Sequence, residues 1–337
     1  MKQVSKLIKG IIGLMIAIAI LLVSDFSNRE GRNANNKTET GRKLKFCLAH
    51  YVDSPNSENA QDGLLKGLKD MGLEEGVHFT VQIFNAQGDA STLNSIVEAI
   101  GSSKWDLIFA TSTPTIQALS QKIKNMPVVF TNVGDPVKAG LGESFEKHNP
   151  GITGVSTMSD FNGMVKMIKT IHPGAKRIGT IFTPAEINSI AYKDKLEEAA
   201  VAGNLELITV PANSATDVYD AAISLSLKNI DAFCQISDNL TASCSSSIIK
   251  VARNSKIPYY AFITKQVAQG AVAAVARDYF QAGYDAAVMG KRILDGEDPG
   301  SIPYQYVTKT DYTINKEAAA FFGVNIPESI VNEAEHK

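Results

Sequence analysis

The chain repeats one pattern of strands and helices in its two halves. In the first half, three apolar segments each lead into small polar residues at the point where a helix or turn would begin: residues 45–51, 105–114 and 126–136. Three segments of the second half follow in the same order: residues 176–189, 230–239 and 257–265. Continuous apolar strands are typical of parallel sheets that helices cover on both faces. The repeat therefore predicts an α/β protein with two similar lobes, each built on a doubly wound parallel sheet.

The order of these strands assigns the chain to the two lobes. We expect residues 44–153 and 279–302 in the first lobe, and residues 154–278 and 303–337 in the second. This division requires three chain crossings, which would form a hinge that lets the lobes open and close. Because parallel sheets bind ligands beyond the carboxyl ends of their strands, two such edges that face each other would form a ligand cleft.

The spacing of apolar residues predicts where the helices lie. In the first lobe, residues 52–58 are expected to be a loop and residues 59–71 a helix. Residues 151–156 are expected to link the lobes, and residues 280–294 to form a helix that covers the first lobe. In the second lobe, residues 241–254 are expected to form one helix.

Composition limits the classes of partner. The chain has 337 residues, 44% of them hydrophobic and 20% charged, which is enough for two cores of roughly 100 to 150 residues each. A formal net charge of -2 gives no broad basic field, so nucleic acid is not expected as a partner. Cys47, Cys234 and Cys244 lack the paired spacing of a zinc site, and we expect neither a metal nor a cofactor. A disulfide between Cys234 and Cys244 remains open.

Residues 1–24 are typical of an export signal or a membrane anchor. Three lysines precede an unbroken apolar run at residues 10–23, which is shorter than the roughly 20 residues that a membrane-spanning helix needs. Residues 25–43 are polar and lack periodicity, which predicts a flexible tether. No cysteine follows the apolar run, so a lipid anchor is not expected, and both a cleaved signal and a retained anchor remain open. We predict an exported protein, either periplasmic or tethered to the outer face of the cytoplasmic membrane.

Six short motifs follow the predicted strands: NAQGD at 85–89, ATSTPTIQAL at 110–119, GDPVKAGL at 134–141, TPAEINS at 183–189, SDN at 237–239 and DY at 278–279. In order and spacing they resemble the substrate-binding proteins of bacterial ABC importers, in the branch that includes tryptophan- and tyrosine-binding members. The resemblance covers residues 44–327. The resemblance implies a periplasmic-binding-protein fold of type I. It further implies that the protein holds a small molecule, with an amino acid favoured and an aromatic one first among these, and delivers it to an ABC permease. We also expect a monomer.

One residue departs from that family's pattern. Lys265 lies where relatives often carry small or acidic residues. The cation keeps an anionic or nucleoside-like ligand open as an alternative to an amino acid.

Two residues of the first lobe predict a site for a ligand carboxylate. Ser112 and Thr113 follow an apolar strand and precede Pro114, a residue suited to the first turn of a helix. Free backbone N–H groups and hydroxyls would therefore meet at a place that favours an anion. The alternative is that one hydroxyl only caps the helix, and the two interpretations are compatible.

Two carboxylates predict the opposite pole of the ligand. Asp238 and Asp278 are expected at the carboxyl ends of strands, where closing the cleft would desolvate them unless a cation is present. A ligand ammonium would supply that cation. The alternatives are a turn or helix cap for Asp238 and an ion pair with Arg277 or Lys265 for Asp278.

Four further residues are candidate ligand contacts. Tyr51 could stack on the ligand or belong to the rim of the cleft, and Asp135 could contact the ligand or only form a turn. For Asn188 and Ser189, the family resemblance favours contact with the ligand or a role in closure.

The sequence carries no signature of catalysis. It contains no G-x-G-x-x-G after a strand, no phosphate-binding G-x-x-x-x-G-K-[ST], no G-x-S-x-G and no H-E-x-x-H motif. No base is paired with a nucleophile, so we predict that the protein is not an enzyme. The alternative to a transport component is a membrane-anchored module that senses a ligand for a signalling partner.

Overall fold

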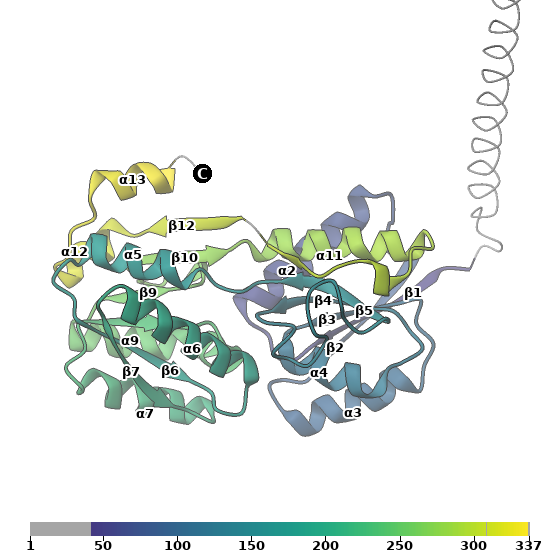
Figure 1. Ribbon diagram of the computed structural model, residues 1–337, viewed down its shortest axis with the longest axis horizontal. Coiled ribbons are helices and arrows are strands. Elements are labelled where there is room, and N and C mark those ends of the chain that lie inside the picture. Colours follow the sequence, from purple (N-terminus) through teal and green to yellow (C-terminus); the bar gives the residue numbers. More distant parts are fainter. Residues whose placement is uncertain (1–41, 308, 336–337) are drawn as a thin grey trace, which may run out of the picture. The chain divides into compact units, whose positions relative to one another are not determined.

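Two six-stranded sheets organise the part of the chain that the computed structural model describes, residues 42–307 and 309–335 (Figure 1). The first sheet has the order β11 (Gln305–Tyr306), β5 (Ile152–Ser156), β4 (Val128–Val133), β3 (Leu107–Thr111), β1 (Leu44–His50) and β2 (Phe79–Asn85). The second has the order β12 (Thr310–Ile314), β10 (Ala273–Arg277), β9 (Tyr259–Ala261), β8 (Ala232–Gln235), β6 (Arg177–Phe182) and β7 (Glu206–Pro211). The two orders correspond strand for strand, which confirms the predicted pair of α/β lobes.

Helices cover both faces of each sheet. In the first lobe these are α2 (Pro55–Asp70), α3 (Ala90–Gly101), α4 (Thr113–Lys122), α11 (Tyr279–Leu294) and the short 3-10 helix η1 (Pro299–Ser301). In the second lobe they are α5 (Phe161–Ile171), α6 (Ile187–Ala202), α7 (Ala215–Ser226), α8 (Asn239–Ser243), α9 (Ser245–Ser255), α10 (Lys265–Ala268), α12 (Lys316–Phe322) and α13 (Glu328–Glu335).

The core of each lobe lies on both sides of its sheet because successive strand residues point to opposite faces. In β1, the buried side chains of Phe46 and Leu48 pack in one cluster with helices α2 and α11. Cys47 and Ala49 pack in the cluster on the other face, with helices α3 and α4. This double burial explains why the strands appear in the sequence as unbroken apolar runs.

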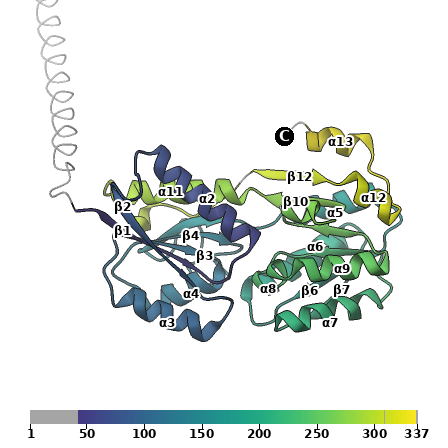
Figure 2. The ribbon, with the colours of Figure 1, turned by 180° about the vertical axis from the view of Figure 1, so that it is seen from behind.

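The packing of α11 on α2 confirms that the helix predicted at 280–294 covers the first lobe, and both ribbon views show the two helices side by side (Figures 1 and 2). A Cβ atom on Gly63 would lie 1.9 Å from the carbonyl oxygen of Phe280. A Cβ on Gly283 would lie 1.9 Å from the carbonyl oxygen of Ala60. The two backbones therefore touch directly, and only glycine fits at these positions.

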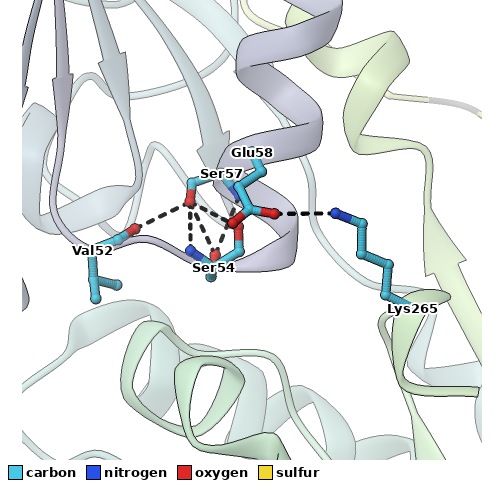
Figure 3. Close-up of polar contacts among 5 residues, drawn as sticks. All are labelled: Val52, Ser54, Ser57, Glu58 and Lys265. Carbon is cyan, nitrogen blue, oxygen red and sulfur yellow. Dashed lines mark hydrogen bonds and ion pairs between the residues drawn. The ribbon is translucent and has the colours of Figure 1, made fainter. Parts of the chain in front are cut away.

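The start of α2 corrects one prediction. The helix begins at Pro55, within the segment 52–58 that was expected to be a loop. Ser57 N–H donates to the Ser54 hydroxyl at 3.2 Å, and Ser54 N–H donates to the Ser57 hydroxyl at 2.8 Å (Figure 3). This reciprocal cap uses serine where the usual signature has Glu or Gln, so the sequence pattern did not reveal it.

Three further boundaries differ from the expectations. Residues 152–156 form strand β5 of the first sheet and are not a link between the lobes. The helix expected at 241–254 is divided into α8 and α9 at Cys244. Gln305 and Tyr306 pair with β5, so residues up to Tyr306 stay with the first sheet, although residues from 303 onward were assigned to the second lobe.

Within the described residues the chain crosses from one sheet to the other three times. The crossings lie between β5 and α5, between β10 and α11, and between β11 and β12. All three cysteines are free thiols, so the bridge between Cys234 and Cys244 that the sequence left open is not formed.

The predicted signal or anchor at residues 1–24 and nearly all of the predicted tether at 25–43 lie outside the described residues. In the ranges 42–307 and 309–335, no helix has both the length and the hydrophobicity to cross a bilayer.

Candidate functional site

A cavity lies between the carboxyl edges of the two sheets. From the first lobe, Val52 follows β1, Thr111 ends β3 and Thr157 follows β5. From the second lobe, Ser237 follows β8 and Tyr279 follows β10. This is the position at which parallel α/β sheets bind ligands, and the prediction of a cleft there is met.

Asp238 is the buried carboxylate of this cavity. It precedes α8, and its Oδ1 accepts hydrogen bonds from Thr241 N at 2.7 Å and Thr241 Oγ1 at 2.5 Å. Its Oδ2 accepts one hydrogen bond, from Ser189 Oγ at 2.5 Å.

Glu186 places a second buried carboxylate behind the cavity wall. It precedes α6, and its Oε2 accepts hydrogen bonds from Asn239 Nδ2 at 2.6 Å, Asn239 N at 3.1 Å and Asn188 Nδ2 at 3.1 Å. Its Oε1 accepts one from Leu240 N at 3.3 Å. Asn188 and Asn239 line the cavity, so Glu186 holds two cavity-lining amides in place.

The two carboxylates have no cation near them in the cavity. Among the described residues, the cavity lining contains no lysine, arginine or histidine. Burial, and then the charge of Asp238, raise the pKa of Glu186 to about 7. Burial also raises the pKa of Asp238, against the hydrogen bonds that favour its ionised form. The site is therefore short of one positive charge, which either a proton or a cationic ligand group would supply.

Ser112 forms the opposing wall in a strained backbone conformation. Its φ of 82° and ψ of 161° lie in a region that residues other than glycine rarely adopt, at a typical cost of about 1 to 3 kcal/mol. The hydroxyl of Ser112 does not cap α4, and it is buried without a hydrogen-bond partner. Four other lining atoms are in the same state: Asn56 Oδ1, Thr157 Oγ1, Asn188 Oδ1 and Ser237 Oγ. Unpaired buried polar atoms at a cavity wall indicate partners on a bound molecule.

Asn132 enters the cavity through an irregularity of β4. The register between β4 and β5 shifts between Phe130 and Val133, and Asn132 has a φ of 59°. Such a bulge turns a side chain out of the regular alternation of a strand. It brings the amide of Asn132 to the cavity wall.

The structure brings four of the eight predicted site residues together. Ser112, Asn188 and Asp238 line the cavity, and Ser189 lies directly behind Asp238. Thr113 is buried beside Ser112, but it does not line the cavity, and its hydroxyl has no partner.

The other three predicted residues have other partners. Tyr51 donates its hydroxyl proton to the carbonyl of Gly88 at 2.8 Å, and Asp135 accepts from Lys138 N at 3.0 Å as a turn residue.

Asp278 caps α11 through Gln281 N at 2.8 Å and pairs with Lys309 at 2.7 Å. The cation of Asp278 is thus Lys309, and neither Arg277 nor Lys265 as the sequence suggested.

Sequence reasoning missed several lining residues and Glu186, the second buried acid of the site. Glu186 lies in the motif TPAEINS, which could have drawn attention to it. Asn56 was missed because the start of α2 was missed, and Tyr192 because it lies a full turn inside α6. Among the described residues, no group of three or more metal-ligating side chains converges.

Two α/β lobes, three crossings and a cavity at the facing sheet edges define a periplasmic-binding-protein fold. The chain belongs to the family of ABC transporter substrate binding proteins, whose sequence model matches residues 45–337. This is a family of binding proteins and not of enzymes. The family and the fold that the sequence motifs implied are thereby confirmed.

Three relatives place the chain within this family. It is 33% identical over 314 residues to a tyrosine-binding protein of Clostridioides difficile (strain R20291), covering 92% of this chain and 91% of the relative. An ABC domain from Streptococcus pneumoniae in complex with L-Trp is 26% identical with a TM-score of 0.83, covering 87% of this chain and 99% of that one. A ligand-free, open structure of a substrate binding protein with adhesive properties from Clostridium difficile is 30% identical with a TM-score of 0.65, covering 84% and 96%.

Proposed function

We propose that this protein is the extracytoplasmic binding component of an ABC importer, and that it captures a free amino acid with an aromatic side chain between its lobes. The observation that carries the proposal is the buried carboxylate of Asp238, which lines the cavity beside the buried Glu186 without any cation. An amino acid brings the ammonium group that this wall lacks. A charged ligand group that forms a hydrogen bond with a buried protein group of opposite charge contributes strongly to affinity.

The opposite wall suits the carboxylate of the same ligand. Ser112 has a free buried hydroxyl and stands at the N-terminus of α4, where backbone N–H groups and the helix dipole favour an anion. An acid on one wall and an anion site on the other match a zwitterion. Asn56 and Asn132 offer further hydrogen-bonding groups.

The relatives and the residues that line the cavity both support the proposal that the ligand has an aromatic side chain. One relative is named for tyrosine binding and another contains L-Trp. In this chain the cavity is lined by Tyr192 and Tyr279, whose rings give apolar faces for an aromatic group. Lys265 does not line the cavity, so it gives no support to an anionic ligand.

The arrangement of the lobes supports capture by closure. The TM-score is 0.83 with the L-Trp complex and 0.65 with the ligand-free, open structure. The sequence identity runs the other way, at 26% with the L-Trp complex and 30% with the open structure. Sequence divergence therefore does not explain the difference, whereas a closed arrangement of the lobes does.

Export and delivery to a permease complete the proposal. The lysines and apolar run of residues 1–24 support export, and membership of the family supports a membrane permease as the partner. We further propose that the protein acts as a monomer.

Thermal unfolding with a set of ligand analogues tests the assignment. L-Tyrosine, L-tryptophan and L-phenylalanine should raise the melting temperature, since a ligand at 100 times its Kd adds about 2.7 kcal/mol to stability. Tyramine lacks the carboxylate and 3-(4-hydroxyphenyl)propionate lacks the ammonium, so both should stabilise the protein far less. If the propionate stabilises it as well as tyrosine does, the assignment of Asp238 as an ammonium partner is wrong.

A further inference from the structure

An ion pair joins the two lobes beside the cavity. Lys265 Nζ, on α10 of the second lobe, lies 3.2 Å from Glu58 Oε2, on α2 of the first lobe (Figure 3). The two residues are 207 positions apart in the chain. Glu58 follows Ser57, which lines the cavity. The pair therefore bridges the lobes next to the ligand site without belonging to it.

Each partner is anchored in its own lobe. Glu58 stands in the first turn of α2, whose N-terminus is fixed by the reciprocal hydrogen bonds of Ser54 and Ser57 (Figure 3). Lys265 is followed by the buried Gln266, whose Oε1 accepts a hydrogen bond from Tyr259 Oη at 2.9 Å. When the lobes rotate apart as rigid bodies, the two anchors must separate and the ion pair must break.

We propose that Glu58 and Lys265 form an electrostatic latch of the closed state, which slows the dissociation of the bound ligand. This inference rests on the proposed function, because it needs a cleft that closes on a ligand. The two residues are positioning residues, since they act through the arrangement of the lobes and do not line the cavity.

The physical effect of the latch is modest and specific. Both side chains are partly exposed, 46% for Lys265 and 60% for Glu58, so water and salt screen their attraction. Exposed pairs of this kind change an equilibrium by roughly 1.4- to 5-fold. Because the pair stabilises the closed state and not the open one, the change should appear as faster opening and faster ligand release.

Stopped-flow measurement with L-tyrosine as the probe tests the latch in the full chain. Lys265→Gln and Glu58→Gln should each speed dissociation by about 1.5- to 5-fold with little change in the association rate. The double variant should be no faster than either single variant, and the charge exchange Glu58→Lys with Lys265→Glu should restore the slow rate. Raising the salt concentration should speed dissociation from the native chain but not from Lys265→Gln.

Another exposed ion pair provides the matched control. Lys122 and Glu98 form a pair within the first lobe, with side chains 59% and 65% exposed. Lys122→Gln removes a similar surface charge without touching the lobe interface, so it should leave the dissociation rate unchanged. Equal dissociation rates and equal salt dependence in Lys265→Gln and the native chain would overturn the latch.

Small-angle scattering of the ligand-free protein distinguishes an error in the proposed latch from an error in the proposed function. Glu58→Lys places two cations face to face, so it should favour the open state and increase the radius of gyration. Adding Lys265→Glu should reverse the increase. If this reversal occurs and L-tyrosine does not bind, the latch is supported and the proposed ligand is wrong. If the radius does not respond to either change, the latch is wrong whatever the ligand.

Discussion

Tyr192 of the second lobe lies directly against Gly134 of the first. A Cβ atom on Gly134 would stand 2.3 Å from Tyr192 Cε1 and 2.5 Å from its hydroxyl oxygen. The Tyr192 ring is buried, and it also lines the cavity. The lobes thus meet so closely at this point that no side chain fits at position 134.

Gly134→Ala should therefore hinder closure without unfolding either lobe. Overpacking of this kind costs about 1 to 3 kcal/mol, which corresponds to a loss of tyrosine affinity of roughly 5- to 150-fold by calorimetry. Gly174→Ala is the matched control, because a Cβ there meets nothing within 4 Å. Unchanged affinity in Gly134→Ala would show that the ligand-bound lobes do not approach as closely as in this structure.

Asp238→Asn should weaken amino acid binding because it removes the carboxylate that faces the cavity. A charge-assisted hydrogen bond contributes about 1.5 to 3 kcal/mol, so the expected loss of affinity is roughly 10- to 150-fold by calorimetry.

Asp278→Ala serves as the contrast to Asp238→Asn. Asp278 caps α11 and pairs with Lys309, so its removal should lower the free energy of unfolding by about 0.5 to 2 kcal/mol with little change in affinity. The reverse outcome, with affinity lost only in Asp278→Ala, would exchange the roles of the two residues.

The fold could be predicted from the sequence because its signals are local. Strands buried on both faces show as unbroken apolar runs, and β1, β3 and β4 were found in this way. The elements that were misjudged depend on contacts. β11 belongs to the first sheet only through its pairing with β5, and α2 begins early only through the mutual capping of Ser54 and Ser57.

The site could be predicted only where a strand leads straight into it. Ser112 and Asp238 follow buried strands, so their direction toward the cleft follows from the topology. The environment of Glu186 depends on Asn239 and Leu240, more than 50 positions away. No spacing rule reveals such a contact. Asp278 was misjudged for the same reason, because its cation is Lys309, on the far side of α11 in the chain.

Ligand binding should depend on pH through Glu186. Burial raises the pKa of Glu186 from its ordinary value of 4.5 to about 7, so between these pH values the folded protein binds a proton that the unfolded chain has lost. The stability of the ligand-free protein should therefore fall as the pH rises from about 4.5 through 7. An ammonium ligand needs the ionised acids, so its affinity should rise over the same range, by at most about tenfold per pH unit for one proton.

Calorimetry with L-tyrosine at several pH values between 5 and 8 measures this dependence. Glu186→Gln cannot titrate and keeps Asp238, so it should bind more weakly and with a flatter pH profile. If the native chain binds equally well across that range, the buried acids do not exchange a proton for the ligand.

The strained backbone conformation of Ser112 predicts that a glycine at this position favours stability but weakens ligand binding. Ser112→Gly and Ser112→Ala both remove the unpaired hydroxyl, so both should lower the affinity for L-tyrosine by roughly 2- to 13-fold, the effect of one hydrogen bond of about 0.5 to 1.5 kcal/mol. Only glycine adopts a φ of 82° with a ψ of 161° without strain. Ser112→Gly should therefore be more stable than Ser112→Ala by about 1 kcal/mol, after the entropy cost of glycine is deducted. Denaturant titration of the two variants measures the difference. Equal stabilities of the two variants would mean that the backbone at position 112 relaxes when the ligand is absent. A glycine variant that is more stable but binds more weakly would show that the strained conformation of Ser112 serves to aim its hydroxyl at the ligand.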